Sequence, residues 1–317
     1  MALKLYKPTS PGVRHRVRLT WDSQGGNLIV PKHLSHGKTS TGGRNNRGRI
    51  TSYHRGGGHK RLLRLVKTPT VMYNMDGTIP GYACGVVTGI QYDPNRTARI
   101  ALVKPYDVQP YPTHHLHSNT PPLIPVYARP HYQIASKDTR VGDVLTWMLD
   151  YKKTEFAISQ IATRQSGSTI FLRDASVGQS LYDIELTPLG GGKRVRSAGT
   201  YAIVQRKTDT HAILRLPSGE IRRFSLRCRA AIGAVGGEDH SLEVIGKAGN
   251  NRHRSKRPRV RGCAMNPIDH PHGGRTAGGR PTMTPWSRIQ KHHSTKRHRS
   301  SFVVATRHSK APNLTDL

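Results

Sequence analysis

Hydrophobic and polar positions alternate over short distances in the central part of the chain. Residues 85–103, GVVTGIQYDPNRTARIALV, hold two β-branched runs on either side of the turn cluster Asp93-Pro94-Asn95, which predicts a hairpin. Further short apolar segments follow at close intervals: STIFL (168–172), SLYDIEL (180–186), TYAIVQR (200–206), HAILRLPSGEIRRF (211–224) and SLEVIG (241–246). Short strands with regular turns and few helix caps predict a mainly β chain of small barrels rather than an α/β sheet.

The pattern breaks down in the flanks and in one internal stretch. Residues 105–130 carry seven prolines, with PYPTHHLHSNTPPLIP at their centre, which indicates an irregular or polyproline-like loop inside the first barrel. The flanks are rich in Gly, Ser, Asn and His and poor in periodic apolar residues. They cannot bury enough surface to offset their ordering entropy, so we expect them to fold only on a partner.

Charge separates the flanks from the centre. The 317 residues hold 51 Lys and Arg against 18 Asp and Glu, a formal net charge of +33. Residues 1–65 hold 14 cations and one acid, residues 246–310 hold 16 cations and one acid, and the 180 residues between them carry only +6. Two cationic arms on a nearly balanced centre predict a polyanionic partner.

Several classes of protein are disfavoured. The three cysteines are scattered without a C-x-x-C pair, which argues against a zinc ribbon or a disulfide framework and favours a reducing compartment. No apolar run approaches the roughly 18 residues of a membrane helix, and the N-terminus lacks a secretory apolar core. Residues 1–20 are basic and free of acids, as in a mitochondrial transit peptide, but Pro8 and Pro11 would interrupt its helix.

Three basic stretches are candidates for RNA contact. Residues 42–61, GGRNNRGRITSYHRGGGHKR, interleave cations with glycines that let backbone amides approach phosphates, while arginine's fork matches phosphate oxygens. Residues 189–201, LGGGKRVRSAGTY, lack the earlier glycine and the Ser or Thr of a phosphate-binding loop, so an NTPase is disfavoured. Residues 247–262 hold seven cations and no acid. Alone, that run also fits a localisation signal or a DNA-binding tail.

The decapeptide MNPIDHPHGG, residues 265–274, has three possible functions. His270 and His272 with Asp269 could ligate a metal, but a catalytic site would need a further ligand. A histidine suits acid–base chemistry, yet no nucleophile or oxyanion pocket is recognisable beside it. The alternative that we prefer is a rigid turn, in which the prolines restrict the backbone, Asp269 caps its own turn and the imidazoles contact bases or phosphates.

The chain resembles the second protein of the large ribosomal subunit, in its bacterial and organellar form. The matching stretches occur in the family's order and cover nearly the whole chain: KPTSPG (7–12), GGRNNRGRIT (42–51), HRGGGHKR (54–61), YDPNR (92–96), RSAGTY (196–201), LPSGE (216–220), RPRVRGCAMNPIDHPHGG (257–274) and TPW (284–286).

The resemblance implies an oligonucleotide-binding (OB) fold barrel followed by an SH3-like barrel, with long basic irregular extensions. The expected units are a basic extension at 1–60, an OB-fold domain at 61–155 with its Pro/His-rich insertion at about 105–127, an SH3-like domain at 156–246 and a basic extension at 247–317 that reaches toward the peptidyl-transferase region.

The resemblance further implies a structural, non-enzymatic protein that binds large-subunit ribosomal RNA, supports subunit association and positions tRNA. His270 would support the architecture of the peptidyl-transferase centre, whose chemistry belongs to RNA. We predict no catalytic or metal-binding residue, and RNA contacts from Arg44, Asn45, Arg47, Arg49, His54, Arg55, His59, Lys60, Arg61, Lys193, Arg194, Arg196, Arg252, Arg254, Lys256, Arg257, Arg259, Arg261, Asn266, Asp269, His270, His272 and Arg275.

The expected partners are large-subunit ribosomal RNA, neighbouring ribosomal proteins and the small subunit across a bridge. No cofactor is expected apart from Mg²⁺ bound to the RNA. The chain departs from the family at the insertion, at RTAGGR (275–280) in place of an acidic glycine run, and at its APNLTDL end. These departures suggest an organelle, the mitochondrion before the plastid, with bacterial cytoplasm as the alternative. Since the match begins at residue 7, synthesis inside the organelle is expected.

Two other functions compete with a ribosomal one. A basic DNA-binding protein would also have cationic arms, but this class does not account for two barrels with a glycine-arginine loop. A metal-dependent hydrolase would centre on His270 and His272. For a protein that neutralises ten phosphates, the logarithm of the binding constant falls with the logarithm of the salt concentration. The slope is about −9 on duplex DNA and about −7 on single strands. Arms this cationic would dissociate from an exposed duplex in salt, so they favour the interior of folded RNA.

Overall fold

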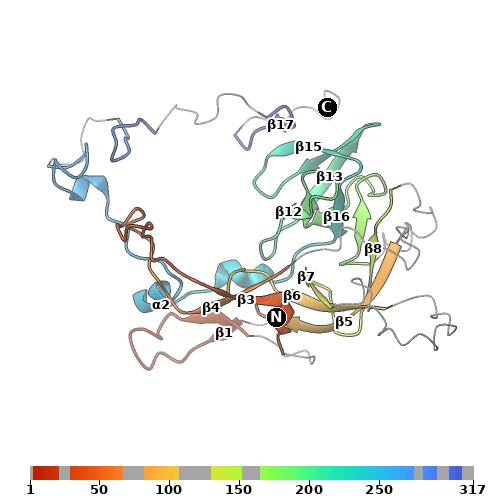
Figure 1. Cartoon of the computed structure of the whole chain (residues 1–317), viewed down its shortest axis with the longest axis horizontal. Coiled ribbons are helices and arrows are strands. Elements are labelled where there is room, and N and C mark those ends of the chain that lie inside the picture. Colours follow the sequence, from red (N-terminus) through yellow and green to blue (C-terminus); the bar gives the residue numbers. More distant parts are fainter. Residues whose placement is uncertain are drawn as a thin grey trace.

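The computed structural model describes residues 3–20, 29–66, 82–106, 130–151, 165–274, 281–290 and 300–308. These residues are mainly β, which confirms the predicted class (Figure 1). The strands of the central sheet are β5 (Tyr82–Gln91), β6 (Ile100–Tyr106), β7 (His131–Ile134), β8 (Val144–Met148), β9 (Thr169–Phe171), β10 (Ser180–Tyr182), β13 (Ala202–Lys207), β14 (His211–Arg215), β15 (Ile221–Ser225), β16 (Arg229–Ile232) and β17 (Val303–Ala305).

Three two-stranded ribbons and a few short helices complete the described elements. The ribbons pair β1 (Leu3–Leu5) with β2 (Val17–Leu19), β3 (Ser35–Lys38) with β4 (Arg61–Arg64), and β11 (Ile184–Glu185) with β12 (Gly192–Arg194). The helical elements are α2 (Ala248–His253) and the 3-10 turns η1 (Lys32–Leu34), η4 (Glu238–Leu242) and η5 (Gly262–Ala264).

The central sheet has the strand order β17-β15-β14-β13-β10-β16-β9-β8-β5-β6-β7. All neighbours in it are antiparallel except β8 and β9, which are parallel and join the two halves where Trp147 lies opposite Thr169. The order has two free ends, so strand pairing among the described residues does not close either half into a barrel. The assignment to OB-fold and SH3-like barrels and the domain limits therefore stay predictions from the resemblance.

Two predicted hairpins are confirmed. In β5–β6, Gln91 lies opposite Ile100, and the Asp93 carboxylate holds the turn by accepting the Asn95 backbone N–H at 2.8 Å and pairing with Arg96 at 3.0 Å. In β14–β15, the turn at 217–219 needs the left-handed backbone of Gly219, with φ of 87°. Local turn chemistry was thus sufficient to place both pairs of strands.

The strand predicted at 241–246 is wrong. Residues up to Leu242 belong to the 3-10 turn η4, which follows the left-handed Gly237, and the next residue with strand pairing is Val244, as an isolated bridge to Val17. Leu242 and Val244 are both exposed. An apolar alternation produces a strand only where one face finds a core, and these side chains find none.

The buried side chains form two principal cores. One contains Val87, Val103 and Trp147 beneath β5, β6 and β8, and the other, larger one contains residues of β9 to β16 such as Leu214 and Phe224. A third cluster at their junction includes Ile134, Tyr182 and Ala231. A buried Arg229–Glu185 ion pair of 2.9 Å reinforces the larger half. Two cores agree with the low hydrophobic content of the sequence.

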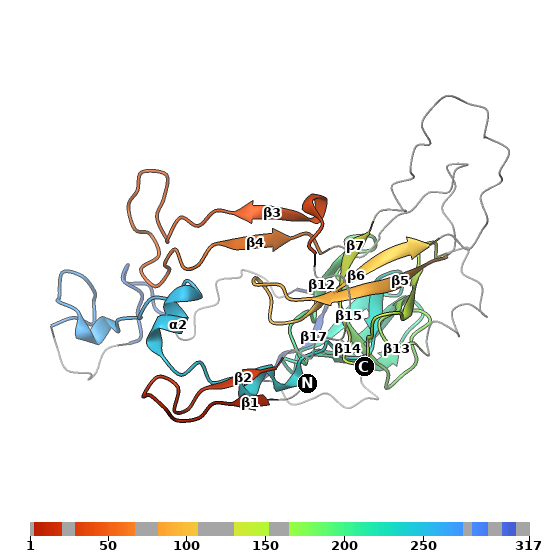
Figure 2. The same cartoon turned by 90° about the horizontal axis from the view of Figure 1, so that it is seen from below.

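The arms extend away from these cores, except that β17 of the C-terminal arm pairs with β15 in the central sheet. In both views the ribbons β1–β2 and β3–β4 and helix α2 reach toward one end of the molecule, while the central sheet occupies the other (Figures 1 and 2). Nearly all of the Pro/His-rich insertion (107–129), RTAGGR (275–280) and the end of the chain from residue 309 lie outside the described residues. The sheet therefore carries the arms at a distance from its own cores.

Candidate nucleic-acid interface

The two cationic arms pair with each other. Arg55 forms an isolated antiparallel bridge with Lys256, and on either side of it the Arg257 N–H donates to the His54 carbonyl at 2.9 Å and the His59 N–H to the His253 carbonyl at 3.0 Å. About 200 residues separate the two segments along the chain. We call the paired segments, residues 42–61 and 247–262, the arm platform.

Gly58 makes this pairing possible. It has a φ of 67°, and a Cβ at this position would clash with the Ser255 hydroxyl and lie 2.9 Å from the His253 carbonyl oxygen. Its neighbour Gly57 has nothing within 4 Å of an added Cβ. The sequence suggested that these glycines let amides approach phosphates. At Gly58 the close approach is to the chain's own second arm.

Asn45 shapes the tip of the platform. Its carboxamide oxygen accepts the backbone N–H groups of Arg47 and Arg49, both at 3.0 Å, and its own N–H donates to the Arg49 carbonyl at 2.9 Å. These bonds close a tight loop and leave the guanidinium-bearing side chains exposed. Asn45 was predicted to touch RNA. The structure shows that its carboxamide oxygen organises the loop that displays the arginines.

Most of the predicted contacts lie on the surface. Exposed residues are Arg44, Asn45, Arg47, Arg49, His54, Arg55, His59, Lys60, Lys193, Arg194, Arg252, Arg254, Lys256, Arg257, Arg259, Arg261, Asn266 and Asp269. Arg61, Arg196 and His272 are partly buried, His270 is buried, and Arg275 lies outside the described residues. Some of these cations have intramolecular partners: Arg61 donates to the His253 carbonyl at 3.1 Å, and Arg254 lies 3.7 Å from Glu243.

The residues of the glycine-rich turn at 189–201 have two different roles. Lys193 and Arg194 are exposed on β12, whereas Arg196 forms a 2.8 Å ion pair with the buried Asp183. Burial lowers the pKa of Arg196, and the charge of Asp183 works against that shift. A Cβ at Gly192 would clash with the Asp183 carboxylate. Gly192 and Arg196 therefore serve the fold of this turn, and Lys193 and Arg194 are its exposed cations.

The loop at 265–274 is closed by its own backbone. The Met265 carbonyl accepts the Gly274 N–H at 3.0 Å, and the Asn266 carbonyl accepts the N–H groups of Asp269 and His270 at 3.0 and 3.3 Å. The expected side-chain cap by Asp269 is replaced by this backbone oxygen, and the Asp269 carboxylate is exposed. The rigid turn predicted from the sequence is thus present, built differently.

His270 is held in one orientation. Its ring occupies the space beside Gly262, where an added Cβ would lie 2.5 Å from the ring. Its Nδ1 accepts the His272 backbone N–H at 3.0 Å, so the neutral ring carries its proton on Nε2. The two imidazole rings lie 4.8 Å apart. A buried ring that accepts from its own loop is suited to fixing architecture.

His272 joins this loop to the segment after it. Its Nε2 lies 3.0 Å from the Pro281 carbonyl and 3.2 Å from the Met283 N–H, and which of the two it bonds depends on the tautomer. In either form, residues 265–274 and 281–290 are tied together by this one ring. The sequence had assigned His272 to RNA contact alone.

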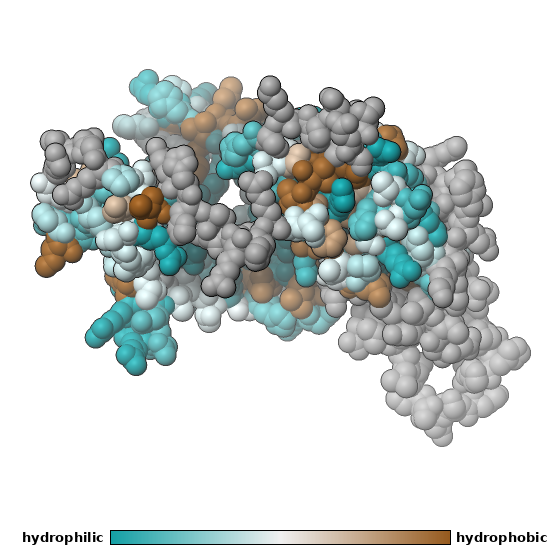
Figure 3. Space-filling model, turned by 90° about the horizontal axis from the view of Figure 1, so that it is seen from above, coloured by the Kyte–Doolittle hydropathy of each residue, from teal (hydrophilic) through white to brown (hydrophobic). Residues whose placement is uncertain are grey.

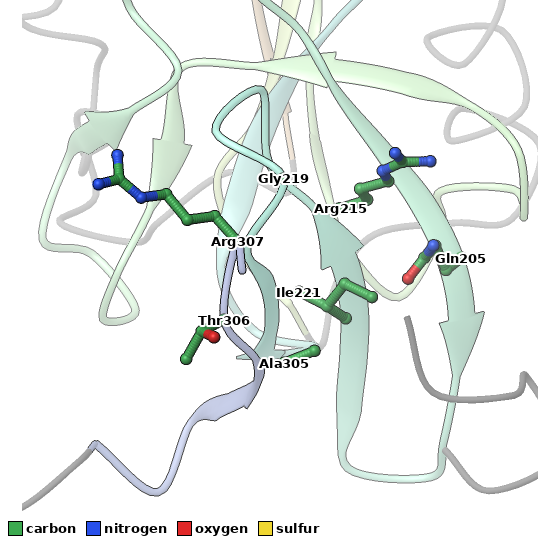
Figure 4. A pocket seen from close by; sticks show the side chains of 7 residues that line it. All are labelled: Gln205, Arg215, Gly219, Ile221, Ala305, Thr306 and Arg307. Carbon is green, nitrogen blue, oxygen red and sulfur yellow. The ribbon is translucent and has the colours of Figure 1, made fainter. Parts of the chain in front are cut away.

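Neither a metal centre nor a converging pocket is found in the part of the chain that the structure describes. No three His, Cys, Asp or Glu side chains there are grouped as metal ligands. A hollow of about 210 Å³ lies between β14, β15 and β17, lined by Gln205, Arg215 and Arg307 among others, but the two guanidinium groups point away from each other (Figure 4). No described helix is both long enough and apolar enough to span a membrane.

Sequence reasoning missed two residues. Asn95, in the β5–β6 turn, donates from Nδ2 to the Leu62 carbonyl at 2.7 Å and accepts from the Lys38 ammonium at 3.2 Å, which ties the β3–β4 ribbon to the sheet. Trp286 has 79% of its surface exposed within a tight turn. The sequence signal for Asn95 was its turn cluster, and the signal for Trp286 was an aromatic residue in a basic arm. Both signals also fit ordinary loops.

Known proteins match this chain along most of its length. The family model "Ribosomal Proteins L2, RNA binding N-terminal domain" matches residues 31–111, and "Ribosomal Proteins L2, C-terminal domain" matches residues 165–293. Proteins named large ribosomal subunit protein uL2 are similar to it in Dinoroseobacter shibae (39% identity), Paracoccus denitrificans (39%) and Paraburkholderia phymatum (40%). Each alignment covers 98% of this chain and 99 to 100% of the relative.

Proposed function

The chain belongs to the ribosomal protein L2 family, and from that premise we propose how it acts in the ribosome. It is a structural, non-enzymatic constituent of the large ribosomal subunit and binds ribosomal RNA. The observation that carries the mechanism is the pairing of residues 54–59 with 253–257, which brings two cationic arms into one surface. That surface binds RNA phosphates, and the two β cores anchor it.

The spacing of charge supports this assignment of roles. Three exposed arginines, Arg44, Arg47 and Arg49, lie in the first segment of the arm platform, and two more, Arg259 and Arg261, lie in the second. The platform's backbone is hydrogen-bonded to itself in the chain alone, which differs from the expectation that the arms fold only on a partner. Its cations therefore lose less conformational freedom when they meet phosphates. Arginine forks placed in this way hold the register of a folded RNA, and they do not read its sequence.

The loop around His270 supports the architecture of the peptidyl-transferase region in this proposal. The buried ring and the closed backbone of 265–274 suit a rigid strut between RNA segments. We expect His270→Ala to leave both cores folded but to weaken peptide-bond formation or subunit assembly, since the ring's packing against Gly262 and its bond to His272 are lost. Particles that carry the variant and translate like the wild type would contradict this role.

Wider contacts belong to the same proposal. Neighbouring ribosomal proteins, a bridge to the small subunit and the positioning of tRNA follow from the position that the family resemblance implies, and the insertion at 105–127 would meet a lineage-specific partner. No cofactor is bound by the chain itself. Mg²⁺ is held by the RNA, so removing it should weaken the complex and leave the melting temperature of the free chain unchanged.

We place this ribosome in the mitochondrial matrix. The insertion and the RTAGGR stretch, which depart from the bacterial pattern, support that location. Plastid and bacterial cytoplasm are the alternatives. Immunoblotting of the chain in purified organelle and cytosolic ribosomes distinguishes all three, and a signal confined to bacterial or plastid ribosomes would contradict the mitochondrial proposal.

Co-sedimentation tests the central function. The chain should travel with large ribosomal particles at high salt and leave them on RNase treatment. Purified chain should also prefer large-subunit ribosomal RNA to duplex DNA of equal length, because folded RNA can surround both arms. Equal affinity for the two, with release from particles at moderate salt, would favour the DNA-binding alternative.

A further inference from the structure

Residues 281–290 form a second rigid turn in the C-terminal arm. Met283 bridges to Ile289, the Thr284 N–H donates to the Arg288 carbonyl at 2.8 Å, and the Gln290 N–H donates to the Thr282 carbonyl at 2.8 Å. The Thr284 hydroxyl also accepts the Arg288 N–H at 3.2 Å. Cross-strand bonds of this kind hold the tip of the turn in one shape.

The tip presents a large aromatic side chain to solvent. Trp286, 79% exposed, lies between Thr284 and Ser287, and Ser287 has the left-handed φ of 59° that reverses the chain. The exposed Arg288 follows it. Because the indole is mostly exposed, it contributes little buried surface to the fold. A rigid, exposed aromatic ring beside a cation is suited to stacking on a base.

The turn is docked on the His270 loop. His272 reaches Pro281 and Met283 through its Nε2, so this ring joins the two turns. The same two turns also expose two aliphatic side chains, Ile268 at 93% and Ile289 at 47%. On the face that Figure 3 shows, the hydrophobic side chains visible at the arm end lie in small groups among hydrophilic ones. Single apolar tips on a hydrophilic surface fit insertion between bases better than a protein interface, whose core is contiguous.

We propose that Trp286 stacks on an unpaired base of large-subunit ribosomal RNA, with His272 as the positioning residue that holds its turn. This inference rests on the proposed function and adds to it a base contact among the phosphate contacts. The charge of the arm supports RNA as the occupant, since residues 246–310 hold 16 cations and one acid. Unpaired bases expose the π faces that aromatic side chains use in RNA recognition.

The test uses the full chain and a transcript of large-subunit ribosomal RNA, with a perfect RNA duplex as the comparison ligand. Trp286→Ala should weaken binding to the transcript by about 5- to 150-fold, the range for loss of one stacked base. The log–log salt slope should stay unchanged, because no cation is removed. Binding to the duplex should be unaffected. Trp286→Phe should retain most of the affinity. Val177→Ala, which shortens an exposed apolar side chain in the β9–β10 connection, outside the arms, should retain all of it.

Fluorescence gives an independent readout. Trp147 is fully buried, so the part of the RNA-induced quenching that disappears in Trp286→Phe reports on Trp286. Substituting Trp21 by Phe in both proteins removes the remaining indole. Full affinity of Trp286→Ala for the transcript, an equal loss on the duplex, or a changed salt slope would overturn the inference, as would loss of a neighbouring ribosomal protein with RNA affinity intact. If the wild-type chain itself fails to bind the transcript, the proposed function fails instead.

Discussion

Gly58 shows at the residue scale how one missing Cβ joins two distant segments. Gly58→Ala should break the pairing of the arm platform, because alanine would have to adopt a left-handed φ at a cost of about 1–2 kcal/mol and also clash with Ser255. We expect at least a fivefold loss of affinity for ribosomal RNA without a change in the melting of the cores. Filter binding and thermal melting measure the two effects.

Gly57 supplies the matched control. It is the preceding residue, its φ is not positive, and it has open space where a Cβ would be added. Gly57→Ala should therefore bind RNA like the wild type. Equal losses for the two variants would mean that the glycines serve the approach of phosphates, as the sequence suggested, rather than the joining of the arms.

His131 makes stability depend on pH. Burial lowers the pKa of its imidazole to about 4, and the ring packs edge-on against Trp147 with centroids 4.9 Å apart. The unfolded residue titrates near 6.5, so the unfolded chain binds more protons between pH 6.5 and 4. This contribution to the free energy of unfolding is fully present above pH 6.5 and is lost as the pH falls toward 4, by up to about 1.4 kcal/mol per pH unit.

Comparison with His131→Phe isolates that contribution. Phenylalanine keeps the aromatic contact with Trp147 and cannot be protonated. The difference in the free energy of unfolding between the two proteins, measured by urea denaturation from pH 7.5 to 4.5, should change steadily below pH 6.5 in the direction that disfavours the wild type. A difference that does not vary with pH would show that His131 does not titrate as a buried group.

At the scale of elements, the β5–β6 turn fixes the direction of the N-terminal arm. Asn95 binds the β3–β4 ribbon through Leu62 and Lys38, and Thr97 accepts the Ala198 N–H at 3.0 Å from the turn of the larger half. The eight-residue connection 92–99 therefore contacts the arm and both halves of the sheet. The motif YDPNR predicted a turn, and the structure adds that the turn is a junction.

Asn95→Ala should release the ribbon without unfolding the cores. It removes two cross-element hydrogen bonds, each worth about 1 kcal/mol, from a ribbon whose Leu62 and Leu63 are already exposed. Amide hydrogen exchange in β3 and β4 should become faster, while exchange in β14 and β15 stays the same. Asn46→Ala, which alters an exposed amide of the same arm, should change neither, and faster exchange in both variants would argue against a specific latch.

At the scale of the whole molecule, the charge of the arms determines how binding responds to salt. Substituting Arg257, Arg259 and Arg261 by alanine should reduce the log–log salt slope of RNA binding by about 2 to 3, since each lost phosphate contact removes about 0.7 to 0.9. Incorporation into large ribosomal particles should fall with it. The triple lysine variant keeps the charge and should keep the slope. An unchanged slope in the alanine variant would place these arginines away from phosphate.

Local patterns predicted much of this molecule correctly. The β5–β6 and β14–β15 hairpins, the mainly β class and the RNA-binding family followed from turn residues, alternation and motifs such as RPRVRGCAMNPIDHPHGG. The segment at 241–246 was mispredicted because its alternation is the same whether or not a core lies beneath it. Trp286 was missed because a sequence does not show whether an aromatic residue is buried.

The sequence by itself determined where the charge lies, where the chain turns and that the partner is a polyanion, because these depend on residue type and on near neighbours. Only the tertiary structure decided that Gly58 meets Ser255, that Asn95 holds the ribbon and that His272 joins two turns. These contacts link positions up to about 200 residues apart through backbone approach and single hydrogen bonds. Such links depend on how the elements are placed in space, and no local pattern encodes that placement.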